Sequence, residues 1–114
     1  MNAKDKRRLK EIARLFEEMD GELEGVDSLG TFLHEKAICK AVLFDLLQIG
    51  ENLKRLSDET GSFFSKNDII GLTSLRNYIA HDYGALDYSI VWKSLEDDVP
   101  RVRDIVLALL NASQ

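Results

Sequence analysis

The sequence contains very little cysteine and proline. Its one cysteine, Cys39, cannot form a disulfide within the chain, which excludes a disulfide-stapled secreted domain and fits a reducing compartment. Because Cys39 lies in an apolar helical run, we predict that it is a buried structural thiol. The one proline, Pro100, leaves long stretches free to form helices.

Long apolar runs are also absent. The longest, AVLFDLLQIG, is interrupted by Asp45 and is far shorter than the roughly 20 residues that a membrane span needs. The N-terminal segment is charged but has no apolar core of the kind found in signal peptides. We therefore expect a cytoplasmic protein without membrane contact.

An excess of positive charge is missing as well. The 114 residues carry a net charge of -5, which argues against a uniformly basic surface for nucleic acid. Any RNA contact would need a local basic patch, and the best candidate lies near the N-terminus. Its residues are Lys4, Lys6, Arg7, Arg8 and Lys10. The alternative interpretation of this basic run is an ordinary solvated helix end. The chain is 45% hydrophobic, enough for a core, and its length predicts one domain over residues 1–114.

Apolar residues recur at helical spacing along most of the chain. We predict an all-α fold, an up-and-down bundle of four helices, or five if Pro100 divides the last. Loops are expected at 20–30 and 57–66, with Ser65, Asp87, and Asp97 or Asp98 as helix caps. The predicted helices cover residues 4–19, 31–56, 68–80, 87–92 and the segment after 97.

The predicted helix at 31–56 is apolar on two sides. Its main stripe runs from Ile38 to Leu56, and a second group, Leu43, Phe44 and Leu47, lies well away from it. That second group needs its own cover, either another helix or a second subunit. A polar line of His34, Asp45, Gln48 and Asn52, with Glu51 at its edge, lies between the two. It is either a solvated face or the border of a site, in which Asp45, Gln48 and Glu51 would be the bordering residues.

The segment LRNYIAHDYG, residues 75–84, concentrates groups that bind anions or move protons. On a helical wheel Arg76 falls at the edge of the core arc, about 40° from Leu72, so its guanidinium must reach water or an acceptor. Candidate acceptors are Asp45, Glu51 and Asp82. Arg76 and His81 are five residues apart and diverge by about 140° in a regular helix. They would meet only if the helix bends, if Arg76 reaches along the axis, or if a twofold axis joins two copies.

A histidine can exchange a proton near neutral pH, and an arginine can stabilise charge on a phosphoryl group. Such a pair could cleave RNA by attack of the 2′-hydroxyl on the adjacent phosphate. The alternative is that His81 is a helix-end residue favoured by the helix dipole, and that Arg76 forms a structural ion pair. The two histidines lack metal-ligand spacing, and no phosphate loop or serine nucleophile motif is present, so we expect no metal and no cofactor.

The segment RNYIAHDY resembles the R-x4-H-x-Y motif of the HepT-like toxins, a family of the HEPN superfamily. LLQIGENLKRLS is similar to the family's segment on the preceding helix, and DYSIVWKSLEDDVPRV to the stretch that follows the motif. The resemblance covers roughly residues 1–110 in order. One departure is FFSKNDIIGL, where the family often has a Pro-Trp pair before the motif helix.

The resemblance implies an all-α HEPN-like bundle that forms a homodimer, with the two motifs facing the cleft between subunits. It implies a metal-independent endoribonuclease, the toxin of a type VII-like toxin–antitoxin system. Arg76 and His81 would be catalytic, and Asn77 and Asp82 would support them. The implied partner is an MntA-like minimal nucleotidyltransferase antitoxin, which would block the toxin by transferring AMP to Tyr83.

Two other functions stay open from the sequence. The chain could be a non-catalytic binding or regulatory subunit of a nucleotidyltransferase, or a structural dimer module without a site. Arg76, His81 and Tyr83 occurring together favour the ribonuclease, because a pure scaffold has no need for all three. An arginine fully paired in the core, with a histidine turned away from any cleft, would favour the structural module.

Overall fold

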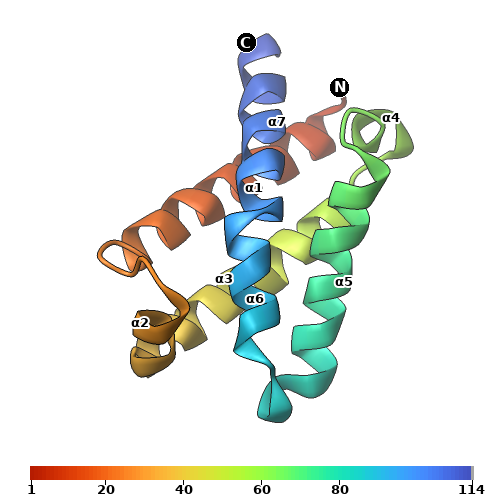
Figure 1. Cartoon of the computed structure of the whole chain (residues 1–114). Coiled ribbons are helices and arrows are strands. Elements are labelled where there is room, and N and C mark those ends of the chain that lie inside the picture. The colour runs from red at the N-terminus through yellow and green to blue at the C-terminus, as the bar shows by residue number, and fades with distance from the viewer. Residues whose placement is uncertain (114) are drawn as a thin grey trace.

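The computed structural model describes residues 1–113, and within that range every regular element is helical, which confirms the all-α prediction (Figure 1). In chain order the elements are α1 (Ala3–Glu22), α2 (Leu29–His34), α3 (Lys36–Lys54), α4 (Asp58–Gly61), α5 (Lys66–Asp82), the 3₁₀ turn η1 (Tyr83–Ala85), α6 (Tyr88–Glu96) and α7 (Asp98–Ala112).

Helix α3 is the centre of the bundle. It packs most extensively against α5 on one side and α1 on the other, while α7 contacts α1 and α5. Figure 1 shows α6 and α7 stacked nearly end to end across the front, with α1 passing behind α7. Both termini lie at the same end of the molecule, where Lys6 Nζ donates a hydrogen bond to the carbonyl oxygen of Ser113 (3.3 Å).

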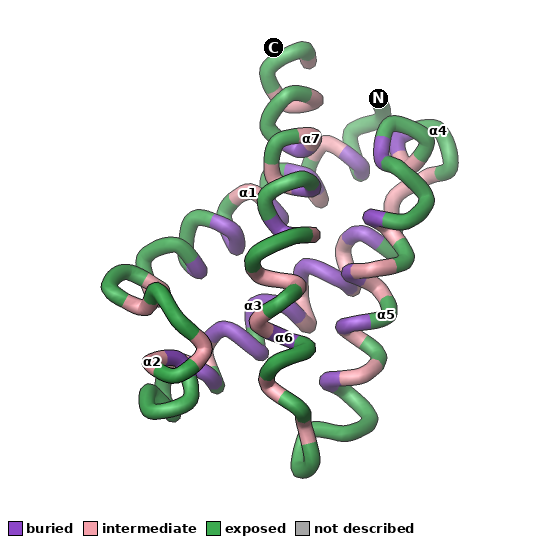
Figure 2. The backbone as a smooth tube through the Cα atoms, in the orientation of Figure 1, coloured by how far each residue is buried: buried purple, intermediate pink, exposed green. Residues whose placement is uncertain are grey.

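The core is built from the apolar stripes that the sequence predicted. Buried positions turn inward on α1, α3, α5 and α7 (Figure 2). Helical spacing predicts one apolar face on α1, and all five of its residues are buried: Leu9, Ile12, Leu15, Phe16 and Met19. Of the four residues predicted to face the core from α5, Leu72, Leu75 and Ile79 are buried and Ile69 is partly buried. Burial of these side chains supplies most of the driving force for folding, because an amphipathic helix of this length is only marginally stable alone.

The predicted helix at 31–56 is wrong, because the structure divides it at Glu35. Glu35 has φ -100° and ψ 73°, outside the helical region, and separates α2 from α3. Ser28 caps α2 by accepting a hydrogen bond from the Thr31 amide (3.1 Å), so part of the expected 20–30 loop is helical. The break lets Phe32 pack on α6, with its ring centroid 5.4 Å from that of Trp92.

The other boundary differences are small. Helix α1 continues past Gly21 to Glu22, and the chain turns at Gly25, whose φ of +81° favours glycine. The 57–66 linker contains the single turn α4, capped by Ser57. Helix α6 ends at Glu96 and α7 begins at Asp98, so residues 1–113 contain five longer helices, with α2 and α4 as additional short ones; the division falls at Asp97 and not at Pro100, which corrects the predicted breakpoint. Pro100 sits in the first turn of α7, where an amide donor has no helical partner to lose.

The second apolar group of α3 is largely covered within the chain. Leu43 is fully buried and Leu47 is partly buried against the core, so for these two residues the cover comes from other helices of the same chain, one of the two alternatives. Only Phe44 remains outside, with 62% of its surface exposed. Cys39 is buried, as predicted, and its thiol donates to the Phe32 carbonyl oxygen (2.9 Å). No helix in residues 1–113 combines the length and the apolarity that a membrane crossing requires.

Candidate functional site

The motif segment lies on the C-terminal half of α5. Ser65 caps this helix by accepting a hydrogen bond from the Asp68 amide (3.0 Å), and the helix then runs without interruption to Asp82. Arg76 and His81 therefore sit on one continuous helix and diverge by about 140° around its axis. The sharp change of direction comes only after Asp82, in η1. A bend before His81, one of the three ways in which these residues could meet, is not present.

Arg76 is held by a carboxylate and an amide. Its side chain is 30% exposed, and its Nε lies 3.4 Å from Glu51 Oε2 on α3. Its Nη1 donates to Asn77 Oδ1 (3.1 Å). Among the three acceptors considered from the sequence, Glu51 is the one that pairs with Arg76. Glu51 also pairs with Arg55 (3.0 Å), so it links two arginines on the same side of α3.

Gly50 makes this arrangement possible. A Cβ atom built at Gly50 would overlap Arg76 Cβ, and it would lie 3.0 Å from Arg76 Cγ and 3.1 Å from the Leu72 carbonyl oxygen. The backbones of α3 and α5 therefore approach each other at this point more closely than any larger residue permits. The next residue, Glu51, is thereby brought within reach of the guanidinium. Gly50, a glycine in the middle of a predicted helix, was the only sequence signal for the close approach of α3 and α5.

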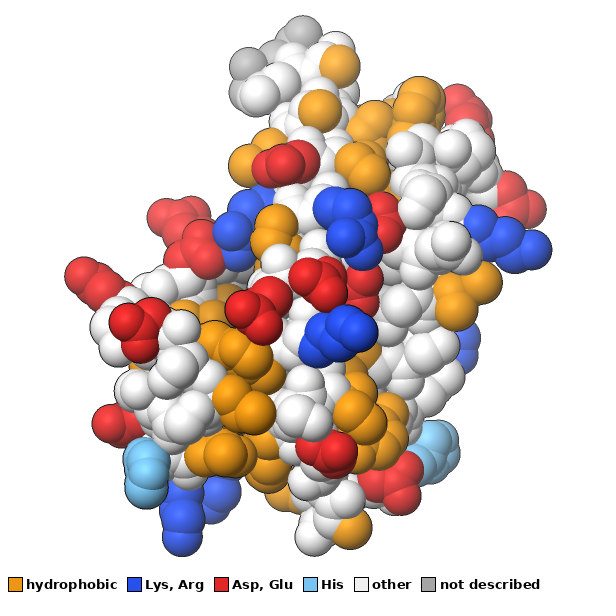
Figure 3. All heavy atoms as spheres, in the orientation of Figure 1, with side chains coloured by type: hydrophobic (Ala, Val, Ile, Leu, Met, Phe, Trp, Pro, Cys, Tyr) orange, Lys and Arg blue, Asp and Glu red, His pale blue; other side chains and the backbone are white. Residues whose placement is uncertain are grey.

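His81 and Asp82 are exposed at the end of α5, and neither has a side-chain hydrogen bond within residues 1–113. A histidine in a final helical turn is favoured by the dipole, and its exposed ring can exchange protons with solvent or a ligand. The second histidine, His34, lies elsewhere: the two pale-blue side chains in Figure 3 occupy opposite edges of the molecule. One chain thus contributes one histidine, His81, to the motif region.

Tyr83 begins η1 and is 51% exposed. The loop that carries it is fixed by Tyr78, whose hydroxyl accepts a hydrogen bond from the Asp87 amide at the start of α6 (2.7 Å). Tyr83 also borders a small pocket of about 230 Å³ that includes Lys36, Lys40 and Tyr88. Burial, and then the neighbouring Cys39 and Tyr83, raise the pKa of the Tyr88 phenol, so the Tyr88 hydroxyl stays protonated at neutral pH.

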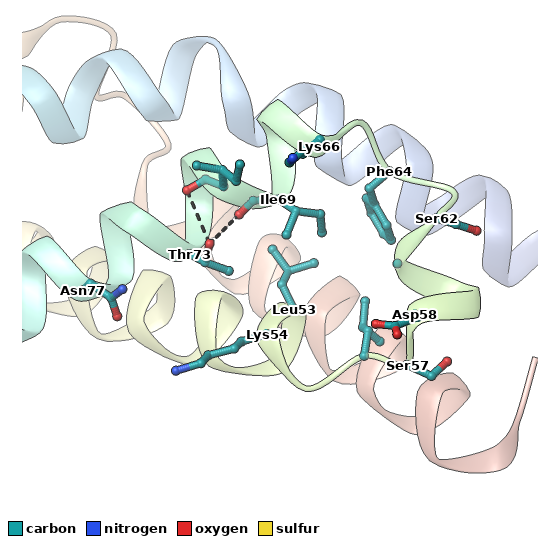
Figure 4. A pocket seen from close by; sticks show the side chains of 13 residues that line it. Leu53, Lys54, Ser57, Asp58, Ser62, Phe64, Lys66, Ile69, Thr73 and Asn77 are labelled. Carbon is teal, nitrogen blue, oxygen red and sulfur yellow. Dashed lines mark hydrogen bonds between the residues drawn. The ribbon is translucent and has the colours of Figure 1, made fainter.

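A larger groove of about 530 Å³ runs from the α4 turn along α5 and reaches Asn77. Figure 4 shows Asn77 at one end, with Leu53, Ile69 and Phe64 forming the apolar wall. Lys54 and Lys66 line the same groove. Asn77, which accepts a hydrogen bond from Arg76, therefore also borders a groove that carries two ammonium groups, those of Lys54 and Lys66.

The basic N-terminal run lies beside the polar side of α3. Lys4, Arg7 and Arg8 form a cleft of about 260 Å³ with Glu11 and with Asn52, the residue that follows Glu51. Asn52 Nδ2 in turn donates to the carbonyl oxygen of half-buried Gln48 (2.9 Å). Asn52 and Gln48, two members of the predicted polar line, thus lie beside the basic end of α1, whereas His34 belongs to α2.

Asp45 lies apart from this arrangement. It is 2% exposed, and its carboxylate faces Glu18 and Glu22 of α1 rather than Arg76. Burial, followed by the proximity of Glu22 and Glu18, raises the pKa of Asp45 to about 8. The two glutamates were not singled out from the sequence. Their spacing of four residues on one helix face, opposite a polar position on α3, was the available signal.

The arrangement offers a half-exposed guanidinium held in place and a proton-exchanging imidazole further along the same helix. A guanidinium binds phosphate oxygens through its fork of donors, and an imidazole can serve as general acid or base. This is chemistry suited to a phosphodiester.

The family profile described as "Ribonuclease HepT-like" matches residues 6–109. Among curated proteins, the chain is 31% identical over 72 residues to "Putative RNase MJ1380" of Methanocaldococcus jannaschii, covering 63% of this chain and 66% of the relative. It is 32% identical over 69 residues to "Putative RNase MJ0127" of the same organism, covering 60% and 57%. It is 25% identical over 83 residues to "Putative RNase TTE0752" of Caldanaerobacter subterraneus, covering 73% and 74%.

The matched part of the chain spans less than two thirds of the length of the first of these relatives. No solved structure matches the chain significantly. The profile match, by contrast, extends over nearly all of the sequence and includes α5 with its motif. The chain belongs to the HepT-like ribonuclease family.

Proposed function

We propose that this protein is an endoribonuclease in which Arg76 and His81 act on a phosphodiester of RNA. The observation that carries the proposal is the Arg76 guanidinium, held between Glu51 and Asn77 while still 30% exposed. A purely structural arginine would be expected to bury its donors in ion pairs. Membership of the HepT-like ribonuclease family supports the choice of RNA as substrate.

In the proposed reaction the RNA 2′-oxygen forms a bond to the adjacent phosphorus and the bond to the 5′-oxygen breaks. The products are a 2′,3′-cyclic phosphate and a 5′-hydroxyl. One proton leaves the attacking hydroxyl and one is delivered to the departing oxygen, and His81 is suited to either transfer. Arg76 would stabilise the charge that develops on the non-bridging phosphate oxygens, with Asn77 and Glu51 fixing its orientation. Asp82, beside His81, would help to orient the imidazole.

Arg76 and His81 point in different directions from one helix, so a single chain would bring only one of them to a given phosphate. A twofold homodimer that brings two α5 ends together would place His81 of one subunit beside Arg76 of the other, which gives two such sites per dimer. The continuity of α5 through Asp82 supports this arrangement, because it excludes the bend that would let Arg76 and His81 of one chain meet. Exposed Phe44 on α3 offers apolar surface for such an association.

RNA would reach the site along basic surface rather than through net charge, which is -5. The cleft formed by Lys4, Arg7 and Arg8 adjoins Asn52, one residue from the Glu51 that holds Arg76. The groove that ends at Asn77 carries Lys54 and Lys66. Binding is expected to be weak and strongly salt-dependent, because only a few phosphate contacts are available.

We further propose that the protein is the toxin of a toxin–antitoxin pair and that a small nucleotidyltransferase neutralises it at Tyr83. The Tyr83 oxygen would attack the α-phosphorus of ATP, forming a tyrosyl–AMP phosphodiester and releasing pyrophosphate. The 51% exposure of Tyr83 and its place two residues after His81 support this role. An AMP group there would add bulk and negative charge beside the phosphate-binding surface.

The test is growth arrest in cells that express the chain alone or with a candidate minimal nucleotidyltransferase as the proposed partner. Wild type should arrest growth, and Arg76→Ala and His81→Ala should each relieve the arrest while the proteins remain folded. Tyr83→Phe, if active, should arrest growth even with the partner present. Equal arrest by all variants, or none by wild type, would count against the active site. An AMP mass increase retained in Tyr83→Phe would move the modification elsewhere.

A non-catalytic subunit of a nucleotidyltransferase is the second candidate. The observation that favours it is the exposure of apolar side chains around the motif helix, including Ile70 at 48% and Phe63 at 61%. Such side chains are typical of surfaces that dock onto a partner. This function predicts that wild type forms a complex with the nucleotidyltransferase and changes its activity, while RNA remains intact in every assay.

A further inference from the structure

Three acidic side chains from α1 and α3 converge at one point of the α1–α3 interface. One carboxylate oxygen from each of Glu18, Glu22 and Asp45 lies within 4.8 Å of the other two. Glu18 is exposed, Glu22 is half-buried and Asp45 is only 2% exposed. The cluster therefore leads from the solvent to the interior.

The inner part of this cluster contains oxygen atoms that lack donors. Asp45 Oδ2 and Glu22 Oε1 are both buried, and within residues 1–113 neither accepts a hydrogen bond. Buried carboxylate oxygens without a donor or a cation are strongly disfavoured. Arg14 does not remove the difficulty, because its closest approach is to Glu11 (2.6 Å) and it meets only the outer residue, Glu18, at 3.3 Å.

We propose that Glu18, Glu22 and Asp45 form a binding site for a hard divalent cation that clamps α1 to α3. Carboxylate oxygens are the preferred ligands of such ions. No pair of the three oxygens is more than 4.8 Å apart, which is twice a calcium–oxygen bond of about 2.4 Å, so small side-chain movements are enough to bring all three onto one calcium ion. Magnesium would need them to close to about 4.2 Å. The exposed side, at Glu18, provides the entry path and room for water ligands.

A proton shared between Asp45 and Glu22 is the competing way to satisfy this pair. Burial and the neighbouring glutamates raise the pKa of Asp45 to about 8, so without a cation the carboxyl holds a proton at neutral pH. A shared proton satisfies the two inner groups but gives no reason for Glu18 to face them. Because a cation must displace that proton, its affinity should increase as the pH rises toward 8 and above. The two explanations therefore differ in their response to added cation.

The experiment measures the thermal midpoint of the full chain at pH 8, after treatment with chelator and dialysis, in titrations with calcium chloride and magnesium chloride. A ligand that binds only the folded state at ten times its Kd raises the folded-to-unfolded ratio about elevenfold, and thus the Tm by about 5 °C. Wild type should show this rise with calcium and a smaller one with magnesium. Calorimetric titration of the same protein with calcium chloride should give a stoichiometry of one ion per chain.

Asp45→Asn should abolish both the rise in Tm and the binding heat, and Glu18→Gln, at an exposed position, should weaken them without affecting folding. Glu17→Gln is the matched control, because it removes the same charge from the exposed face of α1 outside the cluster and should leave the calcium response intact. No cation-dependent change in wild type would overturn the site. So would a calcium response of equal size in Asp45→Asn.

Discussion

Replacing Gly50 with alanine tests the close contact between α3 and α5. The added Cβ would overlap Arg76 Cβ and press on the Leu72 carbonyl oxygen at 3.1 Å. Neither atom is the free end of a flexible side chain, so the two helices must separate. Overpacking of this kind costs up to about 3 kcal/mol. Alanine recovers about 1 kcal/mol through its higher helix propensity, which leaves a net loss of about 2 kcal/mol.

The loss is measured by urea or thermal unfolding of wild type and Gly50→Ala. A domain of this size should lose about 8 °C in Tm for about 2 kcal/mol. Gly21→Ala is the matched control, because Gly21 lies in helix α1 and a Cβ there meets nothing within 4 Å. That variant should be more stable than wild type by about 0.5–1 kcal/mol.

The same substitution should also affect the site. The Arg76–Glu51 contact is already long at 3.4 Å, and a small separation of the helices would take it beyond the range of an ion pair. RNA cleavage by Gly50→Ala should therefore fall even at temperatures where the variant is fully folded, because misplacement of a charge-stabilising group by about 1 Å can cost as much as 10²-fold. If Gly50→Ala is as stable and as active as Gly21→Ala, the close-contact reasoning is refuted.

Three further predictions concern single carboxyl groups. Glu51→Gln should change the free energy of unfolding by less than about 1 kcal/mol, since the ion pair with Arg76 is partly exposed. The same variant should cleave RNA about tenfold more slowly or worse, because Arg76 loses the group that orients it. Unchanged cleavage kinetics would remove Glu51 from the site. Asp5→Asn should cost about 1–3 kcal/mol at pH 7 in urea unfolding. Burial opposes ionisation of Asp5, but hydrogen bonds from Ser57 and Thr60 outweigh it and lower the pKa of Asp5. The stabilisation by the Asp5 carboxylate is therefore present above about pH 4 and disappears as the pH falls through the folded-state pKa. A difference in unfolding free energy between wild type and Asp5→Asn that stays undiminished in strong acid would contradict this. With chelator present, the pKa of about 8 at Asp45 means that the folded state binds one more proton than the unfolded state between pH 5 and 8. The free energy of unfolding should therefore fall by about 1 kcal/mol per pH unit over that range. Asp45→Asn should flatten this slope, and an equal slope in the variant would place its origin in another group.

The helical stripes could be predicted from the sequence because the interior selects apolar residues at helical spacing. The five stripe residues of α1 are all buried as expected, and so are Leu72, Leu75 and Ile79 on α5, while Ile69 of the same stripe is partly buried. The caps at Ser65 and Asp87 were also predictable, since a short polar side chain there satisfies amides that the helix leaves free. These features depend on local chemistry.

The break at Glu35 could not be predicted locally. The segment 31–56 has a continuous apolar pattern, and the chain departs from it because Phe32 packs between α3 and α6 against Trp92. Burial of Leu43 likewise depends on how α1 and α2 cover α3, which a single helical wheel does not contain. Tertiary packing decided both outcomes.

The pairing within the candidate site was predicted in part. The wheel placed Arg76 at the edge of the core and offered three acceptors, but only the approach of α3 at Gly50 selects Glu51 and leaves Asp45 with the glutamates of α1. In the proposed dimer Arg76 of one subunit acts with His81 of the other, since the continuous α5 keeps the two side chains of one chain pointing in different directions. The sequence indicated the residues, and the packing of α3 determined their partners.

Mixing two inactive variants tests the central claim most directly. Purified Arg76→Ala and His81→Ala proteins should each lack RNA cleavage, while wild type yields 2′,3′-cyclic phosphate ends. If each site combines Arg76 of one subunit with His81 of the other, random exchange makes half of the dimers mixed, each with one intact site. The mixture should then recover about a quarter of wild-type activity. Full cleavage by either variant alone would contradict the account, and a mixture that stays inactive although subunits exchange would contradict the shared site.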